Sequence, residues 1–437
     1  MARCCEAVRH FAFIKKITKF AHYSSNCAKM QHIILYDTKA DYGNLLPITF
    51  ARPISGIRVG ITTLREKWEA LVPGRYFIET ADIMCDRLPD EIRNDETLYV
   101  CSSVIPTRAV ADAVGSLRPG ECLVGTDGRT VAFRGSCHKD YLEEDCGEIS
   151  RGDAACRVFP DEVRRLRYVF DIFLNNSFAL NEDYRRLTSG RESRELPCSN
   201  LVLGPYEDED GLPRIFLEEG AQVEGAVINL REGPVYIGRG AKVMEGSCIR
   251  GALALCDNAQ VRMGAKIYGA TTLGPWCKAG GELSNVVMLG YSNKSHDGYL
   301  GNAVIGEWCN IGAGVNASNL KNDYSKIRIW NYVQKRFIHT DLQFCGLIMG
   351  DHSKAGVNCM FNTATVLGVG VNVHGSGFPR VFVPSFSEGS ASAGFTDVSL
   401  KKFFDIAARV MSRRGHEIDD REKKIYEHIY NYSQTHK

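Results

Sequence analysis

Apolar residues recur every six positions along the middle of the chain, and the residue two positions before each is mostly small. The aliphatic positions are Ile237, Val243, Ile249, Leu255, Val261, Ile267 and Leu273, and the preceding ones are Ala241, Ser247, Leu253, Ala259, Ala265 and Thr271. Seven hits in one register have a chance probability on the order of one in ten thousand. The pattern predicts a β-helix of hexapeptide repeats, in which each short strand stacks on the next coil and no coil is stable alone.

The six-residue register is interrupted twice. It slips near Ala279, passes through GYSNKSHDGYLGN at 290–302, and returns at Ile305 and Ile311. A second interruption, NLKNDYSKIRIWNYVQKRFIHTDLQF, ends before the register resumes at Met349, Ala355, Phe361, Leu367 and Val373. Insertions in a solenoid lie on one face and commonly carry function, so we predict that both segments project from the β-helix.

Before residue 200 the pattern alternates between strands and helices. HIILYD, YFIET, TLYVCSSV and ECLVG are predicted strands, and VGITTLREKWEAL is a predicted helix. Residues at helical spacing then mark one apolar face: Leu166, Val169, Phe170, Phe173, Leu174 and Ser177. Strands separated by helices indicate an α/β layer with a mainly parallel sheet, in which ligands bind at the carboxyl ends of the strands.

The two ends of the chain carry other patterns. Residues 1–29 hold six basic residues and one acid. We expect a poorly ordered extension there, with a membrane-surface or targeting helix as the alternative and Met30 as a candidate start. At the other end, two amphipathic helices are predicted within 386–437, the first capped by Thr396 or Asp397 and ended by Gly415. We expect both helices to cover the open end of the β-helix.

The patterns divide the chain into residues 1–29, 30–200, 201–385 and 386–437. Among its 437 residues, 53 are basic and 52 acidic, so no nucleic-acid partner is implied. No apolar run approaches the roughly 20 residues of a membrane-spanning helix. Sixteen cysteines are scattered without a C-x-x-C pair. We therefore expect reduced thiols, no metal site and a cytoplasmic location.

A motif follows the first predicted strand. Leu45, Pro47, Ile48, Thr49 and Pro53 resemble the second half of the sugar-phosphate nucleotidyltransferase signature, L-x-P-L-T-x-x-x-P, without its glycine-rich first half. This resemblance makes the N-terminal domain nucleotidyltransferase-like in ancestry.

Two further features bear on the chemistry of that domain. Thr49, Arg52 and Arg58 are candidate nucleotide-phosphate contacts, with surface or interdomain ion pairs as the alternative for the arginines. Ser102 and Ser103 stand where the nucleotidyltransferases have an Asp that holds Mg²⁺, so Mg²⁺ is expected only if the domain is active.

A second motif lies in the β-helix. His296 precedes Tyr299, Leu300, Gly301 and Asn302, and the run IGEWCNIGAG follows from residue 305. The order and spacing resemble the left-handed β-helix acyltransferases, most closely the bifunctional enzymes that make UDP-N-acetylglucosamine, over roughly residues 31–385. The resemblance implies an α/β nucleotidyltransferase-like (Rossmann-like) domain, then a left-handed parallel β-helix of hexapeptide repeats and C-terminal helices.

The same resemblance implies roles for individual residues. His296 would be the general base that takes a proton from a sugar amine, because an imidazole with a pKa of about 6.5 accepts protons near neutral pH. The sugar-nucleotide side would involve Tyr299, Asn310 and Lys294, and the acyl-CoA side Ala313, Asn319 and Lys326. For the two lysines, solvated side chains are the alternative. Acetyl-CoA or another acyl-CoA would be the co-substrate, a sugar phosphate or nucleotide sugar the acceptor, and a homotrimer the assembly.

Three functional hypotheses follow. The first is an acyltransferase that acts on an amino sugar, its phosphate or its nucleotide. The second is a sugar-1-phosphate nucleotidyltransferase, which would release pyrophosphate. The third is a non-catalytic scaffold that binds sugar nucleotides without turnover.

Overall fold

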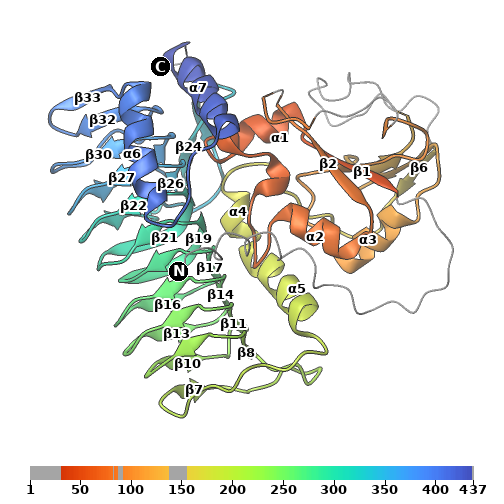
Figure 1. The fold of residues 1–437 in the computed structure, drawn as a ribbon, viewed down its shortest axis with the longest axis horizontal. Coiled ribbons are helices and arrows are strands. Elements are labelled where there is room, and N and C mark those ends of the chain that lie inside the picture. The colour runs from red at the N-terminus through yellow and green to blue at the C-terminus, as the bar shows by residue number, and fades with distance from the viewer. Residues whose placement is uncertain (1–30, 82, 87–91, 137–154, 436–437) are drawn as a thin grey trace, which may run out of the picture.

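The computed structural model describes residues 31–81, 83–86, 92–136 and 155–435, in which an α/β unit lies along one flank of a long β-helix (Figure 1). The extension predicted at residues 1–29 lies outside the described residues. No helix in the described part of the chain is long and apolar enough to cross a membrane.

The α/β unit contains a mixed six-stranded sheet with the order β2-β1-β3-β5-β4-β6. Its strands are β1 (His32–Tyr36), β2 (Arg75–Glu79), β3 (Leu98–Cys101), β4 (Glu121–Val124), β5 (Thr130–Arg134) and β6 (Ala155–Val158). β1 runs parallel to β2 and β3, whereas β5 is antiparallel to both β3 and β4. The prediction of a mainly parallel sheet missed β5, whose short link from β4 can join only antiparallel strands.

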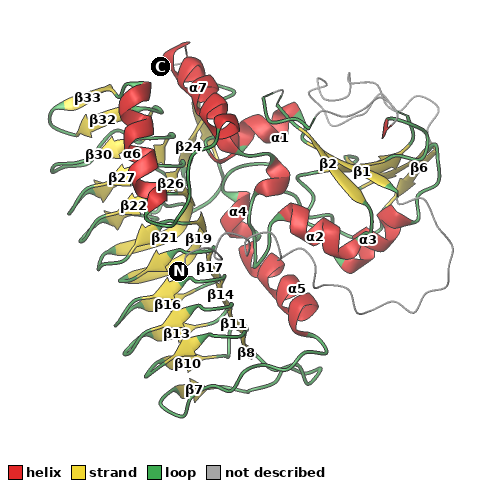
Figure 2. Ribbon diagram, in the orientation of Figure 1, coloured by secondary structure: helices red, strands yellow, loops and turns green. Residues whose placement is uncertain are grey.

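Figure 2 shows the helices of this unit in red, and the helix predicted over 59–71 is shorter than its pattern. The helices are α1 (Lys39–Asn44), η1 (Ile48–Ala51), η2 (Ile54–Gly56), α2 (Leu64–Leu71), α3 (Arg108–Gly115), α4 (Asp171–Leu174) and α5 (Asn176–Thr188). α2 starts at Leu64 because Thr63 and Glu66 form a capping box. The apolar face predicted over 166–177 is wrong at Leu174 and Ser177, which are exposed. The polar Asn176 is buried there instead, since it accepts from the backbone N–H of Gly60.

The β-helix has three faces of parallel strands, as predicted for a left-handed hexapeptide-repeat fold. The first face holds β7 (Leu201–Leu203), β10 (Val227–Asn229), β13 (Cys248–Arg250), β16 (Lys266–Tyr268), the first halves of β19 (Glu282–Gly290) and β21 (Tyr299–Glu307), β23 (Asn316–Ala317) and β28 (Met360–Phe361). The second holds β8 (Ile215–Leu217), β11 (Val235–Ile237), β14 (Leu253–Leu255), β17 (Thr271–Leu273), the second halves of β19 and β21, β26 (Ile348–Met349), β29 (Val366–Leu367) and β31 (Phe382–Val383).

The third face holds β9 (Gln222–Val223), β12 (Lys242–Val243), β15 (Gln260–Val261), β18 (Lys278–Ala279), β20 (Asn293–Lys294), β22 (Asn310–Ile311), β27 (Lys354–Ala355), β30 (Asn372–Val373) and β32 (Ser387–Ser390), and it ends with the antiparallel β33 (Gly394–Asp397). β32 and β33 lie beyond residue 385. The aliphatic residues of the six-residue register fill one continuous core, as Ile237 and Val261 illustrate with no exposed surface. The repeat prediction is therefore confirmed.

The first interruption of the register is not a projecting loop. Val243 pairs with Val261, 18 residues further on, but Ala279 pairs with Lys294, only 15 residues further on. The register slips because this coil is shortened, and residues 290–302 supply β20 and the start of β21. The prediction that this segment is an inserted loop is wrong.

The second interruption is an insertion, as predicted. β24 (Arg328–Asn331) and β25 (Arg336–His339) form an antiparallel hairpin that projects toward the α/β unit. Asn331 donates a hydrogen bond of 2.8 Å to Asn44, and the ring of Tyr332 meets Phe50 edge to face at 5.3 Å between centroids. The hairpin thereby connects the β-helix to the first unit.

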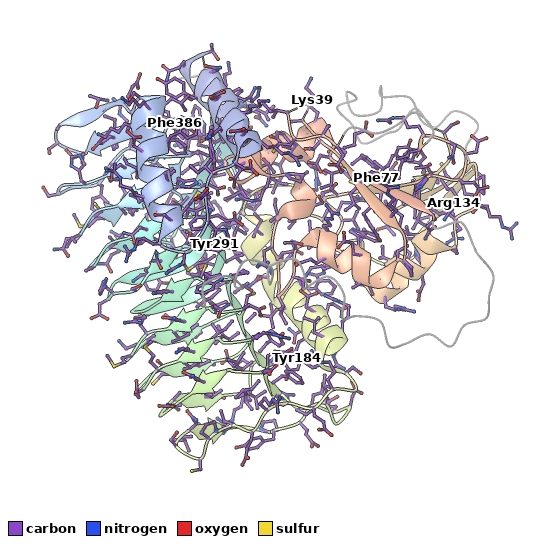
Figure 3. The ribbon with its side chains drawn as sticks, in the orientation of Figure 1. Lys39, Phe77, Arg134, Tyr184, Tyr291 and Phe386 are labelled. Carbon is purple, nitrogen blue, oxygen red and sulfur yellow. The ribbon has the colours of Figure 1, made fainter. Side chains whose placement is uncertain are left out.

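The C-terminal helices α6 (Leu400–Ser412) and α7 (Asp420–Thr435) do not cover the end of the β-helix as predicted. They lie along its flank, and Ser399 caps α6 in place of Thr396 or Asp397, which belong to β33. The reason is a column of corner residues with positive φ: Trp276, Tyr291, Trp308, His352, Gly370 and Phe386. Phe403 of α6 packs against His352 and Phe386, at ring distances of 5.4 and 5.0 Å. Figure 3 labels Tyr291 and Phe386, two points far apart on this column.

A buried ion pair connects the two units. Arg52 donates to the carbonyl oxygen of Ile48 at 2.8 Å, and its other terminal nitrogen lies 2.5 Å from Asp351 and 3.4 Å from Glu307. Both Arg52 and Asp351 are buried. The interdomain ion pair is therefore the alternative that holds for Arg52, and its prediction as a phosphate contact is wrong.

We expect Arg52→Met to lower the free energy of unfolding by about 3–5 kcal/mol, because it leaves the buried Asp351 without its cation. Urea denaturation measures this loss. Arg65→Met is the matched control, since Arg65 pairs with Glu69 at the surface and should cost less than about 1 kcal/mol. Equal losses in the two variants would contradict the structural role of Arg52.

Candidate active site at a corner of the β-helix

A groove of about 560 Å³ lies between the third face of the β-helix and the end of α6. It brings together His296, Asn310 and Ala313, three of the residues singled out by the sequence. Further lining residues come from the neighbouring coils and from α6 and the turn after it: Lys278, Tyr291, Asn293, Ser295, Trp308, Lys354, Val357, Val410, Arg413 and Arg414.

His296 stands on a rigid corner. Its carbonyl oxygen accepts from Lys294 at 2.6 Å, that of Asp297 accepts from the amide of Gly314 at 3.0 Å, and that of Gly298 from the amide of Glu282 at 3.1 Å. The side chain itself is exposed, and no described residue hydrogen-bonds its ring. The imidazole is therefore held by a fixed backbone and is open to a ligand.

Lys294 lies beneath this corner, inside the β-helix. Its side chain points inward in the same column as Ala279 and Ile311, and its ammonium donates to the carbonyl oxygens of Gly280 and His296. Burial lowers the pKa of Lys294 to about 8. A side chain with no exposed surface neither contacts a sugar nucleotide nor lies in solvent, so both readings of Lys294 are wrong.

Tyr299 and Asn319 form a separate cluster on the first face. The Asn319 amide donates to the Tyr299 hydroxyl at 3.1 Å and to Asn302 at 2.8 Å. Lys326 lies at the base of the hairpin, where it donates to the carbonyl oxygen of Asp341. None of the three residues predicted here lines the groove.

The groove is basic. Lys278, His296, Lys354, Arg413 and Arg414 line it, and no carboxylate does among the residues the structure describes. Lys354 donates to the carbonyl oxygens of Trp308 and His352, each at 2.9 Å, and burial lowers its pKa to about 8. A concave surface with cations and no anions favours a negatively charged ligand.

Sequence reasoning missed the aromatic wall of the groove. Tyr291 and Trp308 stack with ring centroids 4.2 Å apart, and His416 meets both rings edge-on. Both stacked residues occupy the same corner of successive coils, with φ values of 54° and 60°. The signal was the recurrence of an aromatic residue one or two positions after a glycine in GPWC, GYSN and GEWC, which the six-residue analysis did not follow.

The candidate residues of the α/β unit face inward. Thr49 is fully buried and donates to the carbonyl oxygen of Tyr42 at 2.7 Å. Arg58 donates to the carbonyl oxygen of Ile61 and lies 3.9 Å from Glu66. Like Arg52, both side chains donate their hydrogen bonds to groups of the protein, so their prediction as phosphate contacts is wrong.

The residues at the carboxyl ends of β1 and β3 are also buried and are not open to a ligand. Asp37 and Asp41 are buried after β1, and Ser103 donates to Asp41 at 2.7 Å. Burial raises the pKa of Asp37 to about 6. Ser102 and Ser103 have no exposed surface, so they offer no open position at which a cation could meet a nucleotide. Within the described ranges, no three His, Cys, Asp or Glu side chains are grouped to hold a metal ion.

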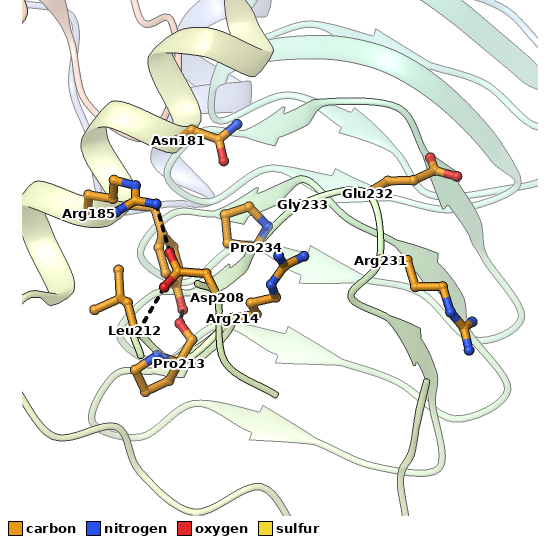
Figure 4. A pocket seen from close by; sticks show the side chains of 11 residues that line it. Asn181, Arg185, Asp208, Leu212, Pro213, Arg214, Arg231, Glu232, Gly233 and Pro234 are labelled. Carbon is orange, nitrogen blue, oxygen red and sulfur yellow. Dashed lines mark hydrogen bonds and ion pairs between the residues drawn. The ribbon is translucent and has the colours of Figure 1, made fainter. Parts of the chain in front are cut away.

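A smaller cavity of about 300 Å³ lies between α5 and the first coils (Figure 4). Its Arg185 pairs with Asp208 at 2.8 Å and with Asp210 at 2.7 Å, and Arg214 donates to the carbonyl oxygen of Leu230. Because Arg185 and Arg214 are engaged by protein acceptors, and the carboxylates of Asp208 and Glu232 also line it, this cavity attracts an anion less than the groove at His296 does.

Comparison with known proteins supports the two-part architecture. Residues 33–192 match a family model described as sugar nucleotidyl transferase. They form a domain of the sugar nucleotidyl transferase type. The bifunctional protein GlmU of Rippkaea orientalis is 25% identical over 239 residues, 47% of this chain and 48% of that protein. The chain thus spans about half the length of this curated relative.

Two solved structures are similar to the chain at low identity. The polysialic acid O-acetyltransferase OatWY is 13% identical, covering 46% of this chain and 88% of that chain, with a TM-score of 0.26. The UDP-N-acetylglucosamine acyltransferase of Francisella novicida is also 13% identical, covering 54% and 76%, with a TM-score of 0.23. Scores of this size carry no argument about function.

The buried ammonium of Lys294 predicts a pH dependence of stability. Its folded pKa of about 8 is below the ordinary 10.5, so the unfolded chain holds more protons between these values and stability rises with pH there. We expect the free energy of unfolding of the wild type to rise relative to that of Lys294→Met from pH 8 to 10.5, by at most about 3 kcal/mol. Urea denaturation at several pH values measures this, and parallel curves would contradict it.

Proposed function

We propose that the β-helix domain transfers an acyl group from an acyl-CoA to the amino group of an amino sugar, its phosphate or its nucleotide. The observation that carries the proposal is the groove, in which an exposed histidine on a rigid corner faces a basic surface that no carboxylate of the described residues lines. An acyl-CoA, an amino-sugar phosphate and a nucleotide sugar all carry phosphate groups, whose negative charge suits a basic surface. The match of residues 33–192 to the sugar nucleotidyl transferase family supports a role in sugar-nucleotide metabolism.

In the proposed reaction, the imidazole of His296 accepts a proton from the sugar amine as its nitrogen attacks the thioester carbonyl. The tetrahedral intermediate then expels the CoA thiolate, which takes a proton from the imidazolium. Ala313 lines the groove, and its amide N–H donates to no group among the described residues. We propose this N–H as the donor that stabilises the oxyanion.

Nucleotidyl transfer by the first domain is not the function we favour. Its Thr49, Arg52 and Arg58 are engaged by protein groups, and Ser102 and Ser103 are buried. A Mg²⁺-dependent release of pyrophosphate from a nucleoside triphosphate and a sugar phosphate would restore that hypothesis. Binding of nucleotides without any turnover would favour the scaffold.

We expect His296→Ala to lower the turnover of acetyl-CoA by 10²- to 10⁴-fold, because the amine loses its proton acceptor. Release of the CoA thiol, followed with a panel of amino sugars and amino-sugar phosphates, measures the rate. His374→Ala is the matched control, since His374 is an exposed histidine at the corresponding corner of a later coil. An unchanged rate in His296→Ala would remove His296 as the base.

We further propose that the chain works as a homotrimer in which a second copy covers the ridge of corners beside the groove. Met263 and Val357 lie on the same corner ridge as His296, on coils to either side of it, and are 68% and 65% exposed. Apolar side chains that are exposed on both sides of the His296 corner favour a protein partner.

Light scattering coupled to gel filtration should give three times the chain mass of 48.5 kDa. We expect the double variant Met263→Asp/Val357→Asp to shift this toward the monomer, because carboxylates would be buried at the contact. Phe378→Asp, which changes an exposed residue between β30 and β31, is the control. A monomeric wild type would refute the proposed assembly.

A further inference from the structure

Four cationic side chains lie close together beside the groove. None of them forms an ion pair with a carboxylate of the described residues. Arg413 and Arg414 come from the turn after α6, Lys278 from β18, and Arg262 follows β15. Arg414 donates to the amide oxygen of Asn293 at 3.5 Å, whereas the side chain of Arg413 hydrogen-bonds no described residue. Three separate elements therefore bring positive charge to one place.

This arrangement is unfavourable without an anion. Burial and the positive charges of Arg414, Arg262 and Arg413 lower the pKa of Lys278. This excess of positive charge belongs to the four side chains and not to the protein as a whole, which has 53 basic and 52 acidic residues. Elsewhere arginines are matched with acids, as Arg185 is with Asp208 and Asp210. A group of like charges kept together at a cost to stability indicates that a ligand supplies the missing negative charge.

The same place offers flat aromatic surface. The guanidinium of Arg414 lies 5.8 Å from the ring centre of Trp276, which is 37% exposed. The stacked pair of Tyr291 and Trp308 lines the groove one coil further along. Aromatic side chains next to cations suit a ligand that combines a planar base with phosphates.

We propose that the turn after α6, together with Arg262 and Lys278, binds the diphosphate of a nucleotide-containing substrate that enters the His296 groove. The proposal deepens the function proposed above and rests on it for the reaction, although the binding itself requires no turnover. Two substrates share this chemistry, the adenosine diphosphate part of CoA and the nucleoside diphosphate of a nucleotide sugar. In either case α6 and its turn form part of the substrate site.

The test compares two double variants of the full chain that remove the same charge. Arg413→Gln/Arg414→Gln removes the cations of the turn. Lys401→Gln/Arg409→Gln removes two exposed cations of α6 that do not line the groove. Each protein is titrated with CoA and, separately, with UDP-N-acetylglucosamine by calorimetry at low and high salt.

We expect the turn variant to weaken binding of at least one of the two ligands by 10- to 100-fold, and the control by less than about threefold. Wild-type binding should weaken with salt, and the turn variant should show a smaller salt dependence. Loss of CoA binding alone assigns the site to the acyl donor, and loss of UDP-N-acetylglucosamine binding alone assigns it to the acceptor. Loss of both assigns it to the shared diphosphate.

Equal affinities in the two double variants, or no binding of either ligand by the wild type, would overturn the proposal. Since Arg414 also contacts Asn293 and Trp276, the single variant Arg413→Gln provides a second measurement in case the double variant unfolds. We expect at least a fivefold weaker affinity from it. The titrations measure binding without turnover, so a failure of the acyl transfer proposed above is distinguished from a failure of binding.

Discussion

The stacking of backbone on backbone between successive coils is the constraint on which this molecule depends. The backbone N–H and C=O groups of each short strand form hydrogen bonds only with the strands of the coils on either side. Every corner must therefore bring the chain back into the same register. Glycine and positive-φ residues make these corners tight. The backbone of such a corner has little conformational freedom. A histidine there is therefore held in a fixed position, unlike a histidine on a mobile loop.

The register was the part of the fold that the sequence could reveal, because burial on a fixed six-residue period leaves a direct trace in the order of aliphatic residues. It could not reveal that the slip near Ala279 is a shortened coil, since deletion of a few corner residues and insertion of a loop both break a period. The hairpin of β24 and β25 was detectable because the segment that contains it is much longer than the turn at any corner of the β-helix. The C-terminal helices were placed wrongly because an apolar stripe on a helix says nothing about which apolar surface it meets.

The residues of the candidate site also fall into those that the sequence could predict and those that it could not. His296, Asn310 and Ala313 were predicted from the resemblance to the β-helix acyltransferases, and the stacking of the coils brings all three to one groove. Lys294 was misread because a lysine in a core column looks in sequence like any surface lysine, and only the carbonyl oxygens of Gly280 and His296 explain it. Arg52 was misread because an arginine suits a phosphate and a buried carboxylate equally well. The basic turn after α6 was invisible until the helix had a position against the coils.

The buried Lys294 also limits how this β-helix can evolve. A solenoid commonly lengthens by duplicating a coil, and the copy is accepted because identical inward side chains stack well. A copy of the coil that carries Lys294 would set a second ammonium about 4.8 Å from the first, in a core with no carboxylate to separate them. Duplication of the coil that carries Lys294 therefore costs more stability than duplication of a coil whose inward residues are all aliphatic, which disfavours a change in the distance from the groove to the hairpin insertion.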